Sequence, residues 1–253
     1  MQKPDCLLHI DFKKKYKEKI MRIALVGYGK MGKIIDEIAT KRGHEVVSKL
    51  NETPTKENLN NPDVVIEFSQ PEVAFNNIKT CLENKIPVVC GTTGWLERKP
   101  EIEKIAIENN TAFLYGSNFS LGVNLFFALN ENLAKLMSRF SEDYTCQLEE
   151  IHHVHKKDAP SGTAISVAEG IIKNSAFESW KLDETNGTEL GITAIREDEV
   201  PGTHSVYYRS EVDEIEIKHT AFSRNGFALG AVIAAEWLPG KKGNFGMKEV
   251  LGL

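Results

Sequence analysis

Short apolar runs and amphipathic stretches alternate along the first half of the chain. The apolar runs cover residues 22–26, 45–50, 64–68, 88–90 and 112–115. The stretches between them have apolar residues spaced three and four apart, at 31–41, 72–84 and 101–109. Such a pattern is typical of a parallel sheet covered by helices on both faces. We therefore predict a doubly wound α/β unit here.

The pattern changes after residue 117. A long helix is predicted over 121–140, a strand over 144–152 and a second helix over 161–173. Three alternating segments follow without helices between them, at 192–196, 204–209 and 214–220, which favours a mainly antiparallel sheet. The apolar face of the last segment (EIEIKH) is expected to be buried, against either another subunit or the rest of the chain. A final apolar helix over 227–238 is expected to return to the first unit.

The first twenty residues differ from the rest of the chain. A buried strand begins at once after them, so Met21 fits a natural start and residues 1–20 a loosely ordered extension. The alternative is an additional helix with Phe12, Tyr16 and Ile20 on one face. The lysines of this segment follow a short apolar patch, which is the wrong order for a signal peptide. No apolar run approaches the roughly 20 residues of a membrane span.

Length and charge limit the classes of function. A chain of 253 residues is long enough for two domains, which is the arrangement we expect. With 31 Lys and Arg against 36 Asp and Glu, the net charge is -5, so no overall basic field exists to hold nucleic acid or an anionic membrane. An anionic ligand must therefore be bound by a local cluster.

The four cysteines indicate a reducing compartment. They are Cys6, Cys81, Cys90 and Cys146, which are widely spaced and form no zinc-type pairs. Cys81 and Cys90 lie in apolar runs typical of buried thiols. A cytoplasmic protein is expected.

The segment VGYGKMG places Gly27, Gly29 and Gly32 in a GxGxxG pattern between a predicted strand and a predicted helix. This context predicts a tight turn, close approach of the backbone to a pyrophosphate and close packing of helix on strand. About twenty residues further on stand Asn51 and Glu52, and an acid there favours NAD through its ribose hydroxyls. Lys49 and Lys56 are near enough in sequence to meet a 2′-phosphate, so NADP stays open.

Two further segments follow the fourth and fifth predicted strands. GTTG covers 91–94 and GSNFS covers 116–120. Open α/β sheets bind ligands at the carboxyl ends of their strands, so these small and hydroxyl residues suit close approach of a nicotinamide. Ordinary turn chemistry explains the glycines equally well.

The segment HHVHKKDAPSGTA, residues 152–164, packs three histidines and two lysines against an apparent helix start. Histidine exchanges protons near neutral pH, lysine supplies fixed positive charge, and the amides at Ser161, Gly162 and Thr163 suit a carboxylate or phosphate. The combination indicates a site for a proton donor and an anion together. If the strand continues, His152 and His153 point to opposite faces.

A metal site would combine His153 and His155 with Asp158. Lys156 and Lys157 lie among them and would repel a cation, so no metal is expected. The favoured interpretation directs one histidine and Lys156 at an anionic substrate docked on the following helix. Asp158 is then an orienting or capping acid.

Taken together, GxGxMG, GTTG, GSNFSLGVN and above all HHVHKKDAPSGTA resemble the dihydrodipicolinate reductase family, also called 4-hydroxy-tetrahydrodipicolinate reductases. The resemblance spans Met21 to the C-terminus. It implies a Rossmann domain over 21–117 and 228–253, completed by the end of the chain. It also implies a central α+β domain over 118–227, with an open mixed sheet that binds substrate and builds a homotetramer.

The resemblance implies residue roles as well. His152 and Lys156 match the family's proton donors, and His153, Gly162 and Thr163 match its contacts to the substrate carboxylates. Contacts to the cofactor, NADH or NADPH, are implied for Gly27, Tyr28, Gly29, Lys30, Met31, Gly91, Thr92, Thr93, Gly116, Ser117, Asn118 and Phe119. The acid after the second strand is displaced to Glu52, which leaves the cofactor preference open. Arg224 could add charge near the site.

The implied reaction is the reduction of a cyclic, imine-containing dicarboxylic acid with loss of water, in lysine and diaminopimelate synthesis. A semialdehyde dehydrogenase would instead need a nucleophilic cysteine near the nicotinamide, and none of the four lies in a convincing loop. A protein that only senses dinucleotides would have no use for HHVHKKDAPSGT.

Overall fold

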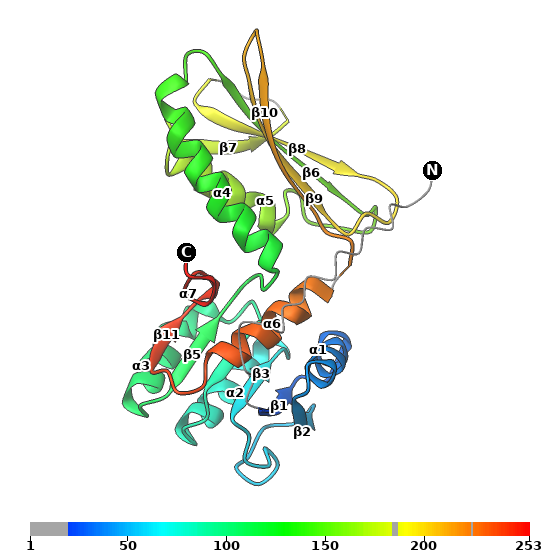
Figure 1. The fold of residues 1–253 in the computed structure, drawn as a ribbon, viewed down its shortest axis with the longest axis vertical. Helices are drawn as coiled ribbons and strands as arrows, with labels where there is room; N and C mark the ends of the chain where they lie inside the picture. The colour runs from blue at the N-terminus through cyan, green and yellow to red at the C-terminus, as the bar shows by residue number, and fades with distance from the viewer. Residues whose placement is uncertain (1–19, 184–186, 224) are drawn as a thin grey trace.

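Two sheets make up the protein in the computed structural model, which describes residues 20–183, 187–223 and 225–253 (Figure 1). The chain passes from the first sheet to the second after β5 and returns after β10. Both interpretations of the N-terminal extension concern residues 1–19, which lie outside the described residues.

The first sheet has six strands in the order β11-β5-β4-β3-β1-β2, and all neighbours are parallel. Its strands are β1 (Arg22–Val26), β2 (Glu45–Leu50), β3 (Val64–Glu67), β4 (Val88–Cys90), β5 (Ala112–Tyr115) and β11 (Gly243–Phe245). Its helices are α1 (Lys30–Lys41), α2 (Pro71–Glu83), α3 (Lys99–Glu108), α6 (Asn225–Trp237) and α7 (Met247–Leu251), with a 3₁₀ turn at Leu96–Arg98. The predicted doubly wound parallel sheet is confirmed.

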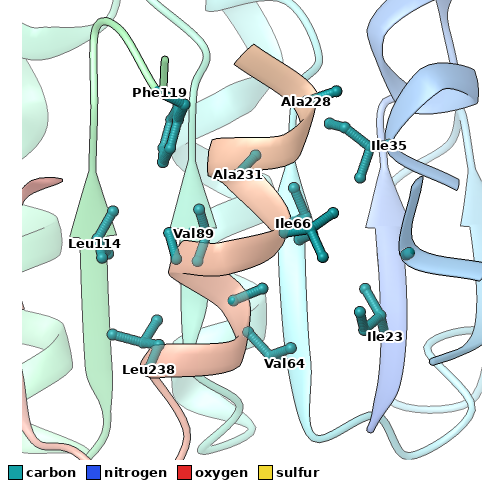
Figure 2. Close-up of a cluster of buried hydrophobic side chains, with 14 of the residues drawn as sticks. Ile23, Ile35, Val64, Ile66, Val89, Leu114, Phe119, Ala228, Ala231 and Leu238 are labelled. Carbon is teal, nitrogen blue, oxygen red and sulfur yellow. The ribbon is translucent and has the colours of Figure 1, made fainter. Parts of the chain in front are cut away.

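Side chains on each strand alternate between two cores. Ile23 and Leu25 of β1 belong to the cluster with α1 and α6, whereas Ala24 and Val26 belong to the cluster with α2 and α3. Figure 2 shows the first of these clusters, in which alanines of α6 lie across the strands. Each Ile or Leu buried in this way stabilises the fold by about 1.5–3 kcal/mol. Burial on both faces explains why these strands read as continuous apolar runs.

The C-terminal helix α6 packs very closely on the segment that leaves the first sheet. A Cβ atom added to Gly230 would lie 1.7 Å from the carbonyl oxygen of Phe119. The Phe119 side chain is itself buried in the core with α6 (Figure 2). The segment that leaves the first sheet and the helix that returns to it are thereby packed in one unit, as was expected for the predicted helix 227–238.

The second sheet has five strands in the order β10-β9-β6-β8-β7. They are β6 (Thr145–His152), β7 (Ser179–Leu182), β8 (Glu189–Arg196), β9 (Thr203–Arg209) and β10 (Glu214–Thr220). Two helices pack on it, α4 (Leu121–Met137), which ends in a 3₁₀ turn at Ser138–Phe140, and α5 (Gly162–Ile172). β9 runs antiparallel to β6 and β10, but β8 runs parallel to β6 and β7.

The sequence-based expectation of a mainly antiparallel sheet was therefore wrong, and the open mixed sheet implied by the resemblance is confirmed. The short strand β7 was not recognised, because its four residues show no buried side chain. With α5 between β6 and the later strands, the chain crosses over and β8 returns parallel to β6.

The alternating segment EIEIKH in β10 is only partly covered within the chain, since Ile215 is exposed and Ile217 is partly buried. Ile217 pairs with Val206 of β9 and packs against the hydrophobic core between the second sheet and helices α4 and α5. Packing inside the chain therefore accounts for Ile217, whereas cover over Ile215 by another subunit stays a prediction.

The cysteines of the described region are free thiols. Cys81 and Cys90 are buried, as expected, and Cys146 is partly buried, while Cys6 lies outside the described residues. Among the described helices, none combines the length and apolar character needed to cross a membrane.

Replacing Gly230 by alanine is expected to lower the free energy of unfolding by about 1–3 kcal/mol, because α6 would have to move away from Phe119. Urea unfolding measures the change. Gly226→Ala in the same helix is the matched control, since its added Cβ atom would meet nothing closer than Ser120 Oγ at 3.5 Å. Equal losses in the two variants would contradict the prediction.

Candidate active site

A cleft of about 500 Å³ lies between the two sheets. Loops of the first sheet contribute Thr93, Ser117 and Asn118. The second unit contributes a set of residues predicted from sequence, namely His152, His153, Lys156, Gly162 and Thr163. The structure thus brings the HHVHKKDAPSGTA segment and the carboxyl ends of the parallel strands to one space. No described cysteine lines this cleft.

Strand β6 ends at His152, which determines where the histidines point. After it the chain turns, with His153 N donating to Val200 O at 2.8 Å and Lys156 N donating to His153 O at 3.0 Å. Strand alternation therefore does not continue, and both His152 and His153 line the cleft. The prediction of opposite faces applied only to a continuing strand, and that condition is not met.

Helix α5 begins at Gly162, and Ser161 is its N-cap, with Oγ accepting from Ala164 N at 3.1 Å. The Ser161 amide is not free, since it donates to both carboxylate oxygens of Glu150 at 3.1 Å. The expected set of three exposed amides is therefore reduced to Gly162 and Thr163. A Cβ atom added to Gly162 would meet nothing within 4 Å, so this end of the helix is open toward the cleft.

Glu150 is a fully buried carboxylate that the sequence analysis did not single out. Its Oε1 lies 3.1 Å from Arg196 Nη2, and its Oε2 lies 3.4 Å from His152 Nδ1 and 3.7 Å from His204 Nε2. The signal for Glu150 was available, because it stands two residues before His152 and so shares its face of the strand. His204 and Arg196 become neighbours only through pairing, His204 opposite Glu150 and Arg196 opposite His152.

Burial disfavours the charged form of both buried histidines. It lowers the pKa of His152, although the Glu150 carboxylate opposes this effect and Lys156 and Arg196 add to it. Burial, with smaller contributions from His152 and His219, lowers the pKa of His204 to about 3. His204 is therefore neutral at neutral pH, with Nε2 3.2 Å from Ser161 Oγ.

Lys156 is held by Asp158, whose two carboxylate oxygens both accept from its Nζ at 2.8 Å. This hydrogen bond from Lys156 is the largest cause of the lowered pKa of Asp158. The geometry agrees with an orienting acid. Arg196 Nη2 in turn donates to the backbone oxygen of Asp158 at 2.6 Å.

The metal ligand set considered from the sequence does not assemble. His155 is three-quarters exposed and lies near Glu199, and Asp158 is engaged by Lys156. Among the described residues, the side chains with converging ligand atoms are Glu150, His152 and His204, within 4.8 Å of one another. The Arg196 guanidinium on Glu150 opposes a cation there.

The glycine turn after β1 has the shape that a dinucleotide needs. Gly27 has a φ of 95°, and a Cβ atom there would lie 2.0 Å from Phe68 O. A Cβ atom on Gly32 would lie 2.4 Å from Gly27 O, whereas one on Gly29 would meet nothing within 4 Å. Helix α1 begins directly afterwards, so the turn leaves an open surface at a helix N-terminus, which fits a pyrophosphate.

The loop after β2 places Asn51 against the glycine turn and leaves Glu52 exposed. Asn51 Oδ1 accepts from Tyr28 N at 2.8 Å, whereas Glu52 is exposed. Lys49 Nζ is 2.6 Å from Asp36 Oδ2. Asn51 is thus the side chain tied to the glycine turn.

The other expected cofactor residues differ in accessibility. The Thr92 side chain is buried and accepts from Ser69 N at 2.8 Å, and Phe119 is buried in the core. Gly91 lies against the Phe68 ring, where an added Cβ atom would be 2.2 Å from the ring. Gly116, Lys30 and Met31 stand at the same carboxyl edge of the sheet. Arg224 lies outside the described residues.

A parallel, doubly wound sheet with this glycine turn, facing a basic cleft, defines a dinucleotide-dependent oxidoreductase. Residues 21–119 match the family model for the N-terminus of dihydrodipicolinate reductase, and residues 122–251 match the model for its C-terminus. The chain belongs to the dihydrodipicolinate reductase family.

Individual proteins of this family are similar to the chain along most of its length. The chain is 53% identical over 234 residues to a 4-hydroxy-tetrahydrodipicolinate reductase of Christiangramia forsetii, covering 91% of this chain and 98% of the relative. It is 37% identical over 238 residues to an enzyme of the same name from Methanocaldococcus jannaschii, covering 90% and 81%. A dipicolinate-bound dihydrodipicolinate reductase from Paenisporosarcina sp. TG-14 shares the fold, with a TM-score of 0.74, 21% identity, and coverage of 91% and 99%.

The neutral, buried His204 is expected to make stability depend on pH. Its folded pKa is about 3, below its unfolded value, so its stabilisation is complete above about pH 6.5 and is lost as the pH falls toward 3. From pH 7.5 to pH 5, the free energy of unfolding of the parent protein should fall by about 2 kcal/mol more than that of the His204→Gln variant, as measured by urea unfolding.

His155→Gln replaces an exposed histidine and serves as the control. It should retain the full pH dependence. If the free energy of unfolding of His204→Gln falls between pH 7.5 and 5 by as much as that of the parent protein, His204 is not the titrating group.

Proposed function

We propose that the protein uses NADH or NADPH to reduce 4-hydroxy-tetrahydrodipicolinate to tetrahydrodipicolinate, with loss of the hydroxyl as water, in lysine and diaminopimelate biosynthesis. The observation that carries the proposal is the convergence of His152, Lys156 and the α5 N-terminus on one cleft with the loops of the parallel sheet. The names of the relatives support the same substrate.

The substrate carries two carboxylates on a protein whose net charge is negative, so local groups must bind them. The amides of Gly162 and Thr163 present hydrogen-bond donors at the positive end of a helix. Lys156 and His153 line the same cleft. We assign the binding of the substrate carboxylates to these four residues.

The residues present fit a nicotinamide dinucleotide. Gly27, Tyr28, Gly29, Lys30 and Met31 would hold the pyrophosphate, because the turn is open at Gly29 and precedes a helix. The loops 91–93 and 116–119 would flank the nicotinamide, with Thr93, Ser117 and Asn118 facing the cleft. When bound, the reduced nicotinamide supplies the hydride.

Both reduced cofactors are proposed as donors. In place of an acid at the end of β2, the chain has Asn51 beside the exposed Glu52. An amide does not repel a 2′-phosphate, and Glu52 is still able to reach ribose hydroxyls.

His152 and Lys156 are assigned as the proton donors to the changing ring. A buried imidazole with a lowered pKa releases its proton readily once protonated. Lys156 keeps its charge close to the cleft because Asp158 holds the ammonium group.

The arrangement of domains is part of the proposal. Residues 21–117 and 228–253 form the dinucleotide-binding domain and 118–227 the substrate domain, which also builds a homotetramer. The pairing of β11 with β5 and the packing of α6 on the first sheet support the split boundary. The three free thiols support a cytoplasmic site of action.

Oxidation of NADH or NADPH, followed by absorbance, tests the reaction. The substrate is generated in the cuvette from pyruvate and aspartate semialdehyde by a separate synthase. Rapid oxidation that requires the synthase is expected with both cofactors, and the ratio of the two rates gives the preference. Absence of oxidation with either cofactor, in folded protein, would overturn the proposed reaction.

His152→Gln and Lys156→Ala are each expected to lower turnover by about 10²–10⁴-fold, because each removes a proton donor. NADH binding, measured by fluorescence titration, should be unchanged. Lys157→Ala removes the adjacent exposed lysine and should leave turnover near that of the parent protein. Near-normal turnover in both site variants would remove the two residues from the mechanism.

Analytical ultracentrifugation tests the oligomer, with a species of about four times the 28.3 kDa chain mass expected. A monomer at micromolar concentration would contradict the tetramer. It would leave the proposed reaction untouched.

A further inference from the structure

Glu150 contacts both the assigned proton donor and the N-terminus of α5. On one side its Oε2 lies 3.4 Å from Nδ1 of His152, the assigned proton donor. On the other its two oxygens accept from the Ser161 amide, directly before the two free amides of α5. No other described carboxylate contacts both the proton donor and the end of this helix.

The burial of Glu150 indicates that the carboxylate has a role beyond stability. The side chain is fully buried at the end of β6, where an unpaired carboxylate would cost several kcal/mol. Arg196 Nη2 at 3.1 Å and the Ser161 amide satisfy it. A buried ion pair adds little net stability compared with an apolar pair, so stability alone gives little reason for a carboxylate here.

The contacts of Glu150 also extend to Lys156. Arg196, which binds Glu150, donates at 2.6 Å to the backbone oxygen of Asp158. The carboxylate of Asp158 in turn holds the Lys156 ammonium group. A single buried carboxylate thus contacts His152 and the Ser161 amide directly, and it is linked to Lys156 through Arg196 and Asp158.

The charged and titratable groups that face His152 come from four places. They are Glu150 on β6 itself, His204 on β9, Arg196 on β8, and Lys156 and Asp158 on the loop before α5. Gly202 lies against the Nε2 edge of the ring, since an added Cβ atom would be 3.0 Å from His152 Nε2. Glu150 is the anionic group in ion-pair contact with the ring, and the cationic neighbours all oppose protonation.

We propose that Glu150 is a positioning residue for the reduction. It holds the His152 ring and the Gly162 and Thr163 amides in one arrangement, and its negative charge favours the protonated form of His152 that donates. The inference rests on the proposed function, because it takes His152 as the donor.

Glu150→Gln tests the role of the charge, since the amide has the same shape and its oxygen can still accept from Ser161 N. We expect kcat/KM to fall by roughly 10–100-fold. The alkaline limb of its pH profile should move to lower pH by about one unit, because imidazolium loses its anionic neighbour. NADH affinity should not change.

Glu149→Gln is the matched control, since Glu149 is the neighbouring carboxylate on the opposite face of β6. It should keep the parent profile. If Glu150→Gln does not fold, Glu150→Asp carries the test. It keeps the charge, so the limb should stay near its original pH while kcat falls through the altered geometry.

A readout without turnover separates this inference from the proposed function. The pKa of His152 can be followed by NMR of histidine-labelled protein, with its signal assigned through His152→Gln. A lower pKa in Glu150→Gln supports the inference even if the parent protein proves inactive on this substrate. An unchanged His152 pKa together with an unchanged pH profile in Glu150→Gln would overturn the inferred role of Glu150. The proposed reaction would still be supported if the parent protein is active.

Discussion

The close packing of α6 against the segment around Phe119 underlies the arrangement of the whole molecule. The chain leaves the first sheet through 116–120 and returns to it through α6, and Gly230 allows the two passages to touch at the backbone. Phe119 is buried in the same core as α6, so this contact is also part of the hydrophobic core. Loops of the parallel sheet and the end of β6 line the same cleft.

The second constraint is the burial of charge at the end of β6. A fully buried carboxylate requires hydrogen-bond donors from several elements, and the mixed sheet supplies them. β8 brings Arg196 and the N-terminus of α5 brings the Ser161 amide as donors to Glu150. β9 brings His204, which lies 3.7 Å from Glu150 and contacts Ser161 Oγ. The parallel pairing of β8 with β6 places Arg196 beside His152. The topology of the sheet and the chemistry of the site are therefore linked.

Much of the fold could be predicted because burial leaves a periodic trace in the sequence. Five of the six strands of the first sheet and its helices α1, α2 and α3 were predicted from apolar runs and from spacings of three and four. The strands β7 and β11 were missed, because they are short and contain no fully buried side chain. The mixed character of the second sheet comes from the parallel pairing of β8 with β6, which the family resemblance implied and the hydrophobic pattern did not.

The candidate site was only partly predictable, for a similar reason. His152, Lys156 and the Gly162–Thr163 amides lie in one continuous segment, so their types and spacing already indicated a proton donor beside an anion site. Glu150 could have been predicted, because it lies two residues before His152 on the same face of the strand. Arg196 and His204 are 44 and 52 residues away from His152 in the sequence, and strand pairing alone makes them neighbours.

The doubly wound sheet, the glycine turn and the chemistry of the HHVHKKDAPSGTA segment could be inferred from the amino-acid order alone, because each depends on interactions within a short stretch of chain. The folded structure was needed to establish which side chains surround His152, that His153 faces the same cleft, and that the Ser161 amide is already bound. These features depend on where β6 ends and on which strands pair beside it. Such contacts join residues far apart in the chain, and no local pattern of hydrophobic and polar positions records them.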